Sequence, residues 1–458
     1  MRARFPSTPI PALLALALPS ATQAPLPPEQ LPAALDALLG RTFKADAPGA
    51  AVLVMRQGKV LLRKGYGLAS VELGVPMAPD AVVHVASVGK QFTAVALLRL
   101  AEQGKVDLQA PVGTYLPDTP PAWSGITLTH LLTHTSGIDN LWNDPAFRAH
   151  EREDWTPAQL FAWMKAKPLV SAPGTRFAYA TANYTLLAMV IEQVTGTPYA
   201  AHLDATLFKP LGMGRTTFDQ APGPVKGRVN PYAGGPRPAP FMSAALGFGG
   251  GSFFSTTEDL ARWSAALHGG KLLKPDTYRA MTTPFRLPDG TDTHYGFGLR
   301  PHAFRGEPYL QANGDIPGFH SEVVVLPKAD VFVAVLSNSE DLPTGLDPLA
   351  KRLAALATGQ PYVEPAAVTL NAPELQRLCA RYALGTRIRT IRMEKGRLVS
   401  AFPGSDPDPL TPISATECRF DEEPDLRLRF QLKDGKSVAV QVGAVDRMPG
   451  PTYTRMAD

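Results

Sequence analysis

The stretch HVASVGKQFTA, residues 84–94, decides how the rest of the chain is interpreted. Ser87 and Lys90 lie three residues apart at the head of an apolar run, which predicts a helix over Val88–Gln103 that ends at Gly104. Residues at this spacing share a helix face, so the amine can reach the hydroxyl. A serine hydroxyl becomes a strong nucleophile when a neighbouring base takes its proton, and a neutral lysine can be that base.

The Ser-x-x-Lys spacing alone is a weak signal, because a serine N-cap followed by a solvated lysine gives the same pattern by chance. Its context is more specific. The run continues as LLRLAEQGKVDL (residues 97–108) and YLPD (115–118), and ITLTHLLTHTSGI (126–138), PGTRFAYATANY (173–184) and EQVTG (192–196) follow in order. Over about residues 48–359, these stretches resemble the class C β-lactamase-like branch of the serine β-lactamase and penicillin-binding protein superfamily, which contains esterases, D-amino-acid peptidases and β-lactamases.

The resemblance implies catalytic roles for three residues. Ser87 would be the nucleophile, Lys90 its base, and Tyr179 a phenol that passes protons to the leaving group. Tyr184 is instead expected to be a core tyrosine. The family's second motif is usually Tyr-x-Asn, but here it ends in Thr181, which is expected either to hydrogen-bond substrate or to fill space.

The family's third motif usually carries a lysine or histidine, any residue, then glycine. Here QANGDIPGF, residues 311–319, aligns on its Pro-Gly-Phe end and places Ala312 at the cation position. Gly314 is kept, and it leaves room for substrate beside the strand. The backbone N–H groups of Ser87 and Asp315 would form the oxyanion hole. Without a cation at Ala312, carboxylate-bearing substrates are expected to be disfavoured.

Two functional classes follow from these residues. The first is a serine hydrolase that cleaves an ester or amide bond through an acyl-enzyme, as an esterase, a D-amino-acid peptidase or a weak β-lactamase or penicillin-binding enzyme. The alternative is a non-catalytic binding protein on the same scaffold, which the altered second and third motifs permit. Retention of Ser87, Lys90 and Tyr179 together favours the enzyme.

Composition narrows the possible partners. The chain has 458 residues, 45% of them hydrophobic and 19% charged, and a net charge of +4 without a basic run, so nucleic acid is not an expected partner. A small molecule or peptide is the expected substrate, no cofactor is expected, and the oligomeric state is left open. His130 and His134 are four residues apart without a nearby acidic ligand, so His134 is predicted to be structural rather than metal-binding.

Residues 1–24 are interpreted as a secretory signal. Arg2 and Arg4 precede a short apolar run over 11–20, and TQA at 22–24 offers a small-residue cleavage site. The run is too short to span a bilayer, so no stable membrane span is expected. These features predict a periplasmic or secreted protein.

The remaining chain is predicted to be α+β, with an antiparallel sheet, flanking helices and a helical subdomain over residues 25–357. A proline-containing linker is expected at 358–368 and a small all-β barrel or sandwich at 369–458, similar to the lipocalin-like accessory domains of this hydrolase branch. The expected strands of this second part are Arg387–Met393, Arg397–Phe402, Glu417–Phe420, Leu426–Leu432 and Ser437–Val442. Cys379 and Cys418 are equally compatible with a disulfide and with two free thiols.

Overall fold

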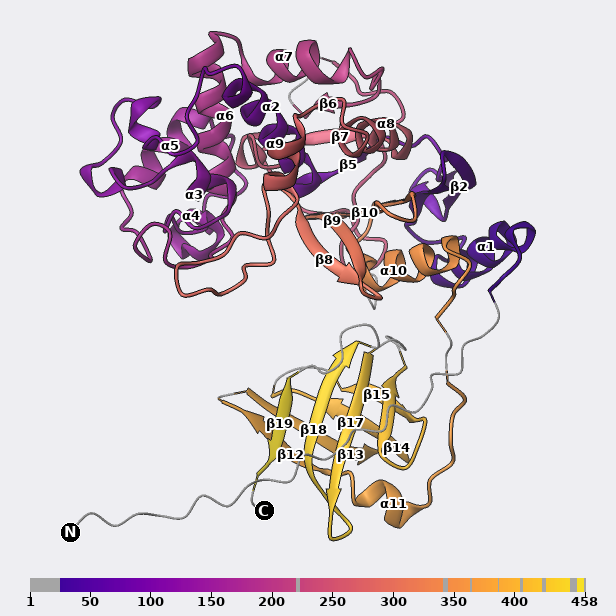
Figure 1. Cartoon of the computed structure of the whole chain (residues 1–458). Helices are drawn as coiled ribbons and strands as arrows, with labels where there is room; N and C mark the ends of the chain where they lie inside the picture. Colours follow the sequence, from indigo (N-terminus) through magenta and orange to yellow (C-terminus); the bar gives the residue numbers. More distant parts are fainter. Residues whose placement is uncertain are drawn as a thin grey trace, which may run out of the picture.

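The computed structural model describes residues 25–456 except 220–222, 341–344, 363–364, 386, 404–406, 422–425 and 445–450. The predicted signal at 1–24 lies outside the described residues. The chain forms an α+β domain and, below it in Figure 1, a closed β-barrel. The predicted fold class is therefore confirmed, while the domain limits given above remain a prediction.

A six-stranded antiparallel sheet is the centre of the α+β domain. Its strand order is β2-β1-β11-β10-β9-β8, so the N-terminal hairpin pairs with the last strand of the domain. The strands are β1 (Ala50–Arg56), β2 (Lys59–Tyr66), β8 (Arg300–Phe304), β9 (Glu307–Ile316), β10 (Phe319–Leu326) and β11 (Val331–Ser337). The sequence also predicts a hairpin over residues 48–67, with Gln57 and Gly58 at its turn, and strands over 322–326 and 331–336, and all of these lie in this sheet.

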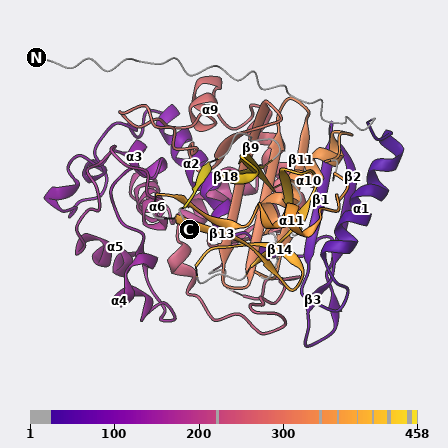
Figure 2. The ribbon, with the colours of Figure 1, turned by 90° about the horizontal axis from the view of Figure 1, so that it is seen from below.

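The two faces of the sheet support two separate hydrophobic cores. In β11, Val333 and Val335 face the helices α1 (Leu31–Thr42) and α10 (Leu346–Ala357), whereas Ala334 and Leu336 face the larger core of the helical subdomain. This follows from the two-residue period of a strand, which sends successive side chains to opposite faces. Figure 2 shows α1 at one side of the sheet and the helical subdomain at the other.

The helical subdomain and its neighbouring elements cover the second face. The helices are α2 (Lys90–Glu102), α3 (Leu128–Leu132), α4 (Pro145–Arg148), α5 (Pro157–Lys165), α6 (Thr181–Thr195), α7 (Tyr199–Leu203), α8 (Thr257–His268) and α9 (Pro275–Met281). Two small sheets complete the domain: β3 (Leu68–Ser70) with β4 (Val75–Pro76), and β5 (Val83–His84), β7 (Phe253–Ser255) and β6 (Thr217–Phe218).

Two helices begin differently from the prediction. The helix expected from Val88 begins as a short 3-10 turn over Ala86–Gly89, called η2, and continues as α2. The sequence STTE at residues 255–258 predicts a capping box that begins at Ser255, but Thr256 caps α8 by accepting the N–H of Asp259 at 3.2 Å. The cap is shifted by one residue because Ser255 is still part of β7.

The C-terminal part is a barrel rather than a sandwich. Eight strands pair in sequence and the first pairs with the last, which closes the cylinder. The strands are β12 (Ala380–Leu384), β13 (Arg387–Glu394), β14 (Arg397–Ala401), β15 (Asp408–Pro412), β16 (Glu417–Phe420), β17 (Leu426–Lys433), β18 (Lys436–Ala444) and β19 (Thr452–Arg455), preceded by α11 (Ala372–Gln376). All five predicted strands are present, and β12, β15 and β19 were not predicted.

Cys379 and Cys418 are both free thiols, so of the two alternatives left open by the sequence the structure shows the unpaired one. Burial raises the pKa of the Cys418 thiol to about 12, which keeps it protonated and unreactive. Among the residues described, no helix is long and apolar enough to cross a membrane.

Candidate active site

Ser87 lies in the η2 turn, and Lys90 is the first residue of α2. The Lys90 Nζ donates to Ser87 Oγ at 2.9 Å, as the three-residue spacing predicts. Tyr179 comes from the segment before α6 and donates its hydroxyl to the same Ser87 Oγ at 2.9 Å. Residues 92 positions apart in the sequence thus meet at one oxygen atom, which has an amine and a phenol as its two neighbours.

Lys90 is held in a buried position by two further groups. It is 1% exposed, donates to the carbonyl of Gly250 at 2.6 Å, and lies 5.0 Å from the ring centroid of Tyr179. The glycines before β7 make this approach possible. A Cβ at Gly250 would lie 2.6 Å from the methyl of Thr181, and one at Gly251 would lie 2.8 Å from the Ser87 nitrogen. The glycine-rich segment therefore packs its backbone against the site.

Tyr179 and Tyr184 have different surroundings. Tyr179 lines the recess that contains Ser87. Tyr184 is fully buried and donates its hydroxyl to the carbonyl of Leu132 at 2.9 Å, and burial raises its pKa well above the usual value for a phenol. The structure therefore places Tyr179 beside Ser87 and Tyr184 in the core.

His134 packs against the ring of Tyr179. Its ring centroid lies 4.3 Å from that of Tyr179, and its Nδ1 accepts the N–H of Ala180 at 3.2 Å and the amide of Asn183 at 3.1 Å. Burial, and then the charges of Lys90 and Arg300, hold the pKa of His134 well below its usual range, so the ring is neutral. His134 is a buried, hydrogen-bonded residue, as predicted.

The amide of Asn183 does not replace the one missing at Thr181. Asn183 is fully buried, and its Oδ1 accepts the hydroxyl proton of Ser136 at 2.7 Å while its Nδ2 contacts His134. Thr181 is the first residue of α6 and lines the large cavity beside Ser87. The second motif therefore presents a hydroxyl and a methyl group to the cavity where the family usually has an amide.

The third motif lies on β9, directly against the η2 turn. A Cβ at Gly314 would lie 2.4 Å from the carbonyl oxygen of Val85 and 2.7 Å from the Ser87 nitrogen, so only glycine fits here. Ala312 is buried and lines the recess with Ser87 and Tyr179. The Asp315 carboxylate lies 3.0 Å from His320 Nε2. Asp315 also lines the large cavity beside Ser87. Ser87 and Asp315, the residues predicted for the oxyanion hole, therefore line the same cavity.

A cavity of about 510 Å³ opens on Ser87. Its apolar wall consists of Trp142, Met242, Leu246, Ile316 and Pro317, and Arg148 and Glu151 add charged groups. A cavity of this size and composition accepts a small ligand with an apolar body.

Sequence reasoning missed His84, which lines the same cavity. Its Nδ1 accepts the N–H of Ala86 at 3.2 Å, and Ala86 has a φ of 46°, a left-handed conformation that is costly for a residue with a side chain. Burial lowers the pKa of His84 to about 3, which keeps Nδ1 available as an acceptor. His84 thus holds the strained turn that presents Ser87, and its position three residues before the serine was the available signal.

Tyr295 and Arg300 were also missed, and both line the recess with Ser87. They lie in YGFGLR, residues 295–300, where alternating glycines indicate a close backbone approach. Gly298 has a φ of 79°, and a Cβ there would lie 2.8 Å from the Lys90 carbonyl oxygen. This packing brings the start of β8 close to Ser87. The residues involved are far apart in the sequence, so no local sequence pattern predicts their contact.

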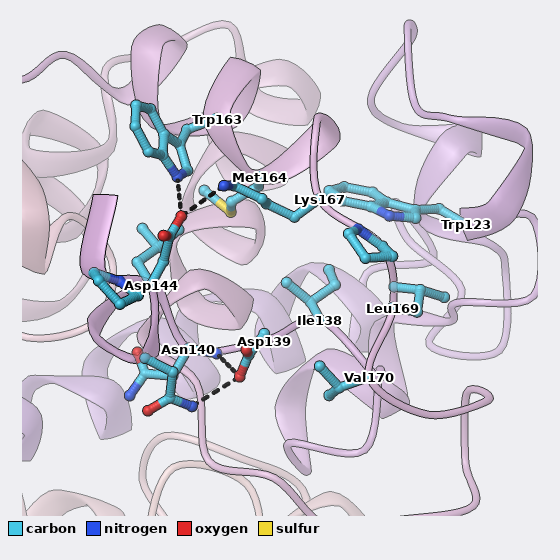
Figure 3. A pocket seen from close by; sticks show the side chains of 14 residues that line it. Trp123, Ile138, Asp139, Asn140, Asp144, Trp163, Met164, Lys167, Leu169 and Val170 are labelled. Atoms are coloured by element: carbon cyan, nitrogen blue, oxygen red, sulfur yellow. Dashed lines mark hydrogen bonds and ion pairs between the residues drawn. The ribbon is translucent and has the colours of Figure 1, made fainter. Parts of the chain in front are cut away.

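A second cavity, of about 280 Å³, lies in the helical subdomain and does not contain Ser87 (Figure 3). Its charged groups are already paired: Lys167 Nζ and Trp163 Nε1 contact Asp144 at 2.7 and 3.1 Å, and Asp139 accepts from the Asn143 side chain at 2.8 Å. Lys167 and Asp144 therefore neutralise each other in this cavity. The part of the chain that the structure describes also contains no group of three or more side chains suited to a metal ion.

The similarity of the chain to known proteins agrees with this geometry. The β-lactamase family model matches residues 32–358. The chain is 27% identical over 344 residues to a D-aminopeptidase of Gluconobacter oxydans, covering 73% of this chain and 62% of that protein. It is 30% identical over 309 residues to esterase EstB of Burkholderia gladioli, covering 58% of this chain and 79% of the esterase.

Among solved structures, the octameric penicillin-binding protein homologue from Pyrococcus abyssi matches with a TM-score of 0.64 and 24% identity. The match covers 90% of this chain and 97% of that one, so the similarity in fold extends beyond the α+β domain. The matched family model spans the sheet, the helical subdomain and every residue that meets at Ser87. The chain therefore belongs to the β-lactamase family, whose members are serine hydrolases.

Proposed function

We propose that this protein hydrolyses an ester or amide bond through an acyl-enzyme formed on Ser87. The observation that carries the proposal is the pair of 2.9 Å contacts from Lys90 Nζ and Tyr179 Oη to one oxygen, Ser87 Oγ. In this arrangement the neutral amine or the phenolate takes the serine proton as Oγ attacks the substrate carbonyl. The other group of the pair then protonates the leaving group. In a second cycle, water attacks the ester that links the acyl group to Ser87.

The oxyanion of the tetrahedral intermediate would bind between Ser87 and β9. The Ser87 and Asp315 backbone N–H groups are assigned as its donors, because Gly314 allows β9 to approach the η2 turn at backbone contact distance. The apolar cavity wall would bind the acyl side of the substrate. The relatives named a D-aminopeptidase and an esterase support small esters and D-amino-acid amides or peptides as the substrates to test.

The test is intact-mass analysis after incubation with a fluorophosphonate probe, followed by a panel of esters, D-amino-acid peptides and β-lactams. Ser87→Ala should abolish both labelling and turnover, and Lys90→Ala should slow acylation roughly a hundredfold or more. Ser124→Ala, at an exposed serine outside the site, is the matched control and should behave as the wild type. Turnover by Ser87→Ala at the wild-type rate would refute the mechanism, and absence of any labelling would favour a non-catalytic binding protein.

We also propose that the protein is exported to the periplasm or the medium. The support is the charged and then apolar composition of residues 1–24 followed by TQA. The N-terminal sequence of the protein recovered from the periplasm should begin near Ala24 or Pro25. Recovery of the intact N-terminus from the cytoplasm alone would contradict this proposal.

A further inference from the structure

The second cavity of the helical subdomain and the cavity beside Ser87 share one wall. This wall is the segment 139–151, which contains α4. Trp142, Arg148 and Glu151 of the segment line the cavity beside Ser87. The second cavity is lined by other side chains of the same segment, namely Asp139, Asn140, Leu141, Asn143, Asp144 and Pro145. The two linings have no residue in common, so neighbouring residues of one short segment face two separate cavities.

The second cavity is suited to an apolar body. Its volume is about 280 Å³, and its wall contains the side chains of Ile138, Leu141, Met164, Leu169 and Val170. Val170 is 41% exposed, so the cavity is open to solvent and a small molecule can enter it without unfolding of the subdomain. A cavity of this size and lining fits a single aromatic ring or a short aliphatic chain.

The charge of the second cavity favours a cation. Lys167 Nζ lies 2.7 Å from Asp144, so these two charges cancel. Asp139 Oδ1 accepts the backbone N–H of Asn140 and the side-chain amide of Asn143, both at 2.8 Å. These donors are neutral, and within the described ranges Asp139 forms no ion pair and its Oδ2 accepts no hydrogen bond. The cavity therefore holds one uncompensated negative charge beside its apolar wall (Figure 3).

A buried aromatic ring connects the two cavities. Trp163 lines the second cavity, and Trp142 lines the cavity beside Ser87. The fully buried ring of Phe147 contacts both, with centroid distances of 5.7 Å to Trp163 and 6.0 Å to Trp142. Asp144 also joins the two sides, because it accepts the Trp163 Nε1 proton at 3.1 Å and caps α4. A molecule in the second cavity therefore touches the packed group that positions Trp142.

We propose that the second cavity binds a small amine with an apolar or aromatic body, and that this binding acts on the cavity beside Ser87. The ammonium group donates to Asp139 Oδ2, and the body packs against Met164 and Leu169. A filled cavity restrains the segment 139–151, so less conformational entropy is lost when a second molecule binds beside Trp142. An anion of the same shape is repelled by Asp139. The binding site itself does not depend on the reaction proposed above.

Calorimetry tests the site with 2-phenylethylamine, its neutral analogue 2-phenylethanol and the anion 3-phenylpropionate. The wild type should bind the amine most tightly. Asp139→Asn, which keeps an acceptor for its two neutral donors, should weaken amine binding roughly tenfold, as expected for loss of one charge-assisted hydrogen bond. Val170→Lys, at a partly exposed position of the wall, should weaken it by repulsion. Asp46→Asn, at an exposed site outside both cavities, is the control and should bind as the wild type does.

The site would be refuted by equal affinity of the wild type for the amine and the alcohol, or by unchanged amine affinity in Asp139→Asn. The effect on the other cavity is tested by hydrogen exchange, which the bound amine should slow over residues 139–151 whether or not the protein is an enzyme. Unchanged exchange in that segment would overturn the connection between the cavities.

Fluorophosphonate labelling gives a second measure of this connection. At an amine concentration that saturates only the wild type, labelling of Ser87 should become severalfold faster in the wild type and stay unchanged in Asp139→Asn. An equal change in both proteins would show that the amine acts from the cavity beside Ser87, and slower labelling would contradict the ordering effect. If Ser87 is not labelled at all, the proposed hydrolysis fails, whereas calorimetry and hydrogen exchange still decide this inference.

Discussion

Replacing Gly314 by alanine tests the placement of β9 against the nucleophile. The added Cβ would lie 2.4 Å from the Val85 carbonyl oxygen and 2.7 Å from the Ser87 nitrogen, whereas ordinary contact begins near 3.4 Å. Both neighbours are backbone atoms, which cannot rotate away as a side chain can. The strand or the η2 turn must therefore move by roughly 1 Å, judged from the shortest contact.

Two effects of different size follow from this displacement. Forcing an extra methyl group into a filled site costs about 1–3 kcal/mol of unfolding free energy. The catalytic effect should be larger in relative terms, because a displacement of about 1 Å at a reaction centre, or loss of one oxyanion donor, lowers the rate by about 10²- to 10³-fold. We therefore expect a folded protein in which Ser87 is acylated very slowly.

The assay is the rate of fluorophosphonate labelling together with denaturant unfolding of the same variant. Gly40→Ala is the matched control: Gly40 is exposed in α1, a Cβ there meets no atom within 4 Å, and alanine in a helix stabilises by about 0.5–1 kcal/mol. It should label at the wild-type rate. Wild-type labelling and stability in Gly314→Ala would refute both the approach of β9 to Ser87 and the oxyanion hole inferred from it.

Two further predictions concern stability and domain organisation. Burial, and then the neighbouring Asp347 charge, raise the pKa of Glu322 well above its usual value, so the folded state favours the neutral acid. The unfolded chain releases this proton more easily. The free energy of unfolding therefore falls as pH rises above about 4.5. Glu322→Gln should therefore gain stability over the wild type by about 1.4 kcal/mol per pH unit between that point and the raised pKa of Glu322, as measured by denaturant titrations at several pH values, and Glu29→Gln, at an exposed site, is the control variant. Limited proteolysis should cut within 358–368 and leave a large fragment that keeps Ser87 labelling, whereas aggregation of that fragment without labelling would contradict a separable barrel.

The sequence predicted those parts of the site that depend on local spacing. Ser87 and Lys90 meet because residues three apart in a helical turn share a face, and this contact holds in the structure although the turn is 3-10 rather than α. The alternating strands of the barrel were found for the same reason, since their period is local. By contrast, β15 contains Pro409 and Pro412, which weaken a strand pattern, and it was missed.

The residues that sequence reasoning missed are placed by distant contacts. Arg300 lines the recess with Ser87 because β8 pairs with β9 and because Gly298 packs on the Lys90 carbonyl, and neither relation leaves a periodic signal. His84 is close in sequence to the nucleophile, but its role depends on the left-handed conformation of Ala86, which is unusual for alanine. The local pattern therefore pointed to Ser87 and Lys90, and the tertiary structure was needed to identify the groups around them.

The order of strands in the main sheet also determines when the candidate site can form during synthesis of the chain. Ala50 at the start of β1 pairs with Ser337 at the end of β11, and β9, the strand beside the nucleophile, pairs with β10. A nascent chain that already contains Ser87, Lys90 and Tyr179 still lacks this strand, so it cannot complete the reaction centre. The candidate site is therefore complete only after β9 has been synthesised, and the pairing of strands far apart in the chain makes folding comparatively slow.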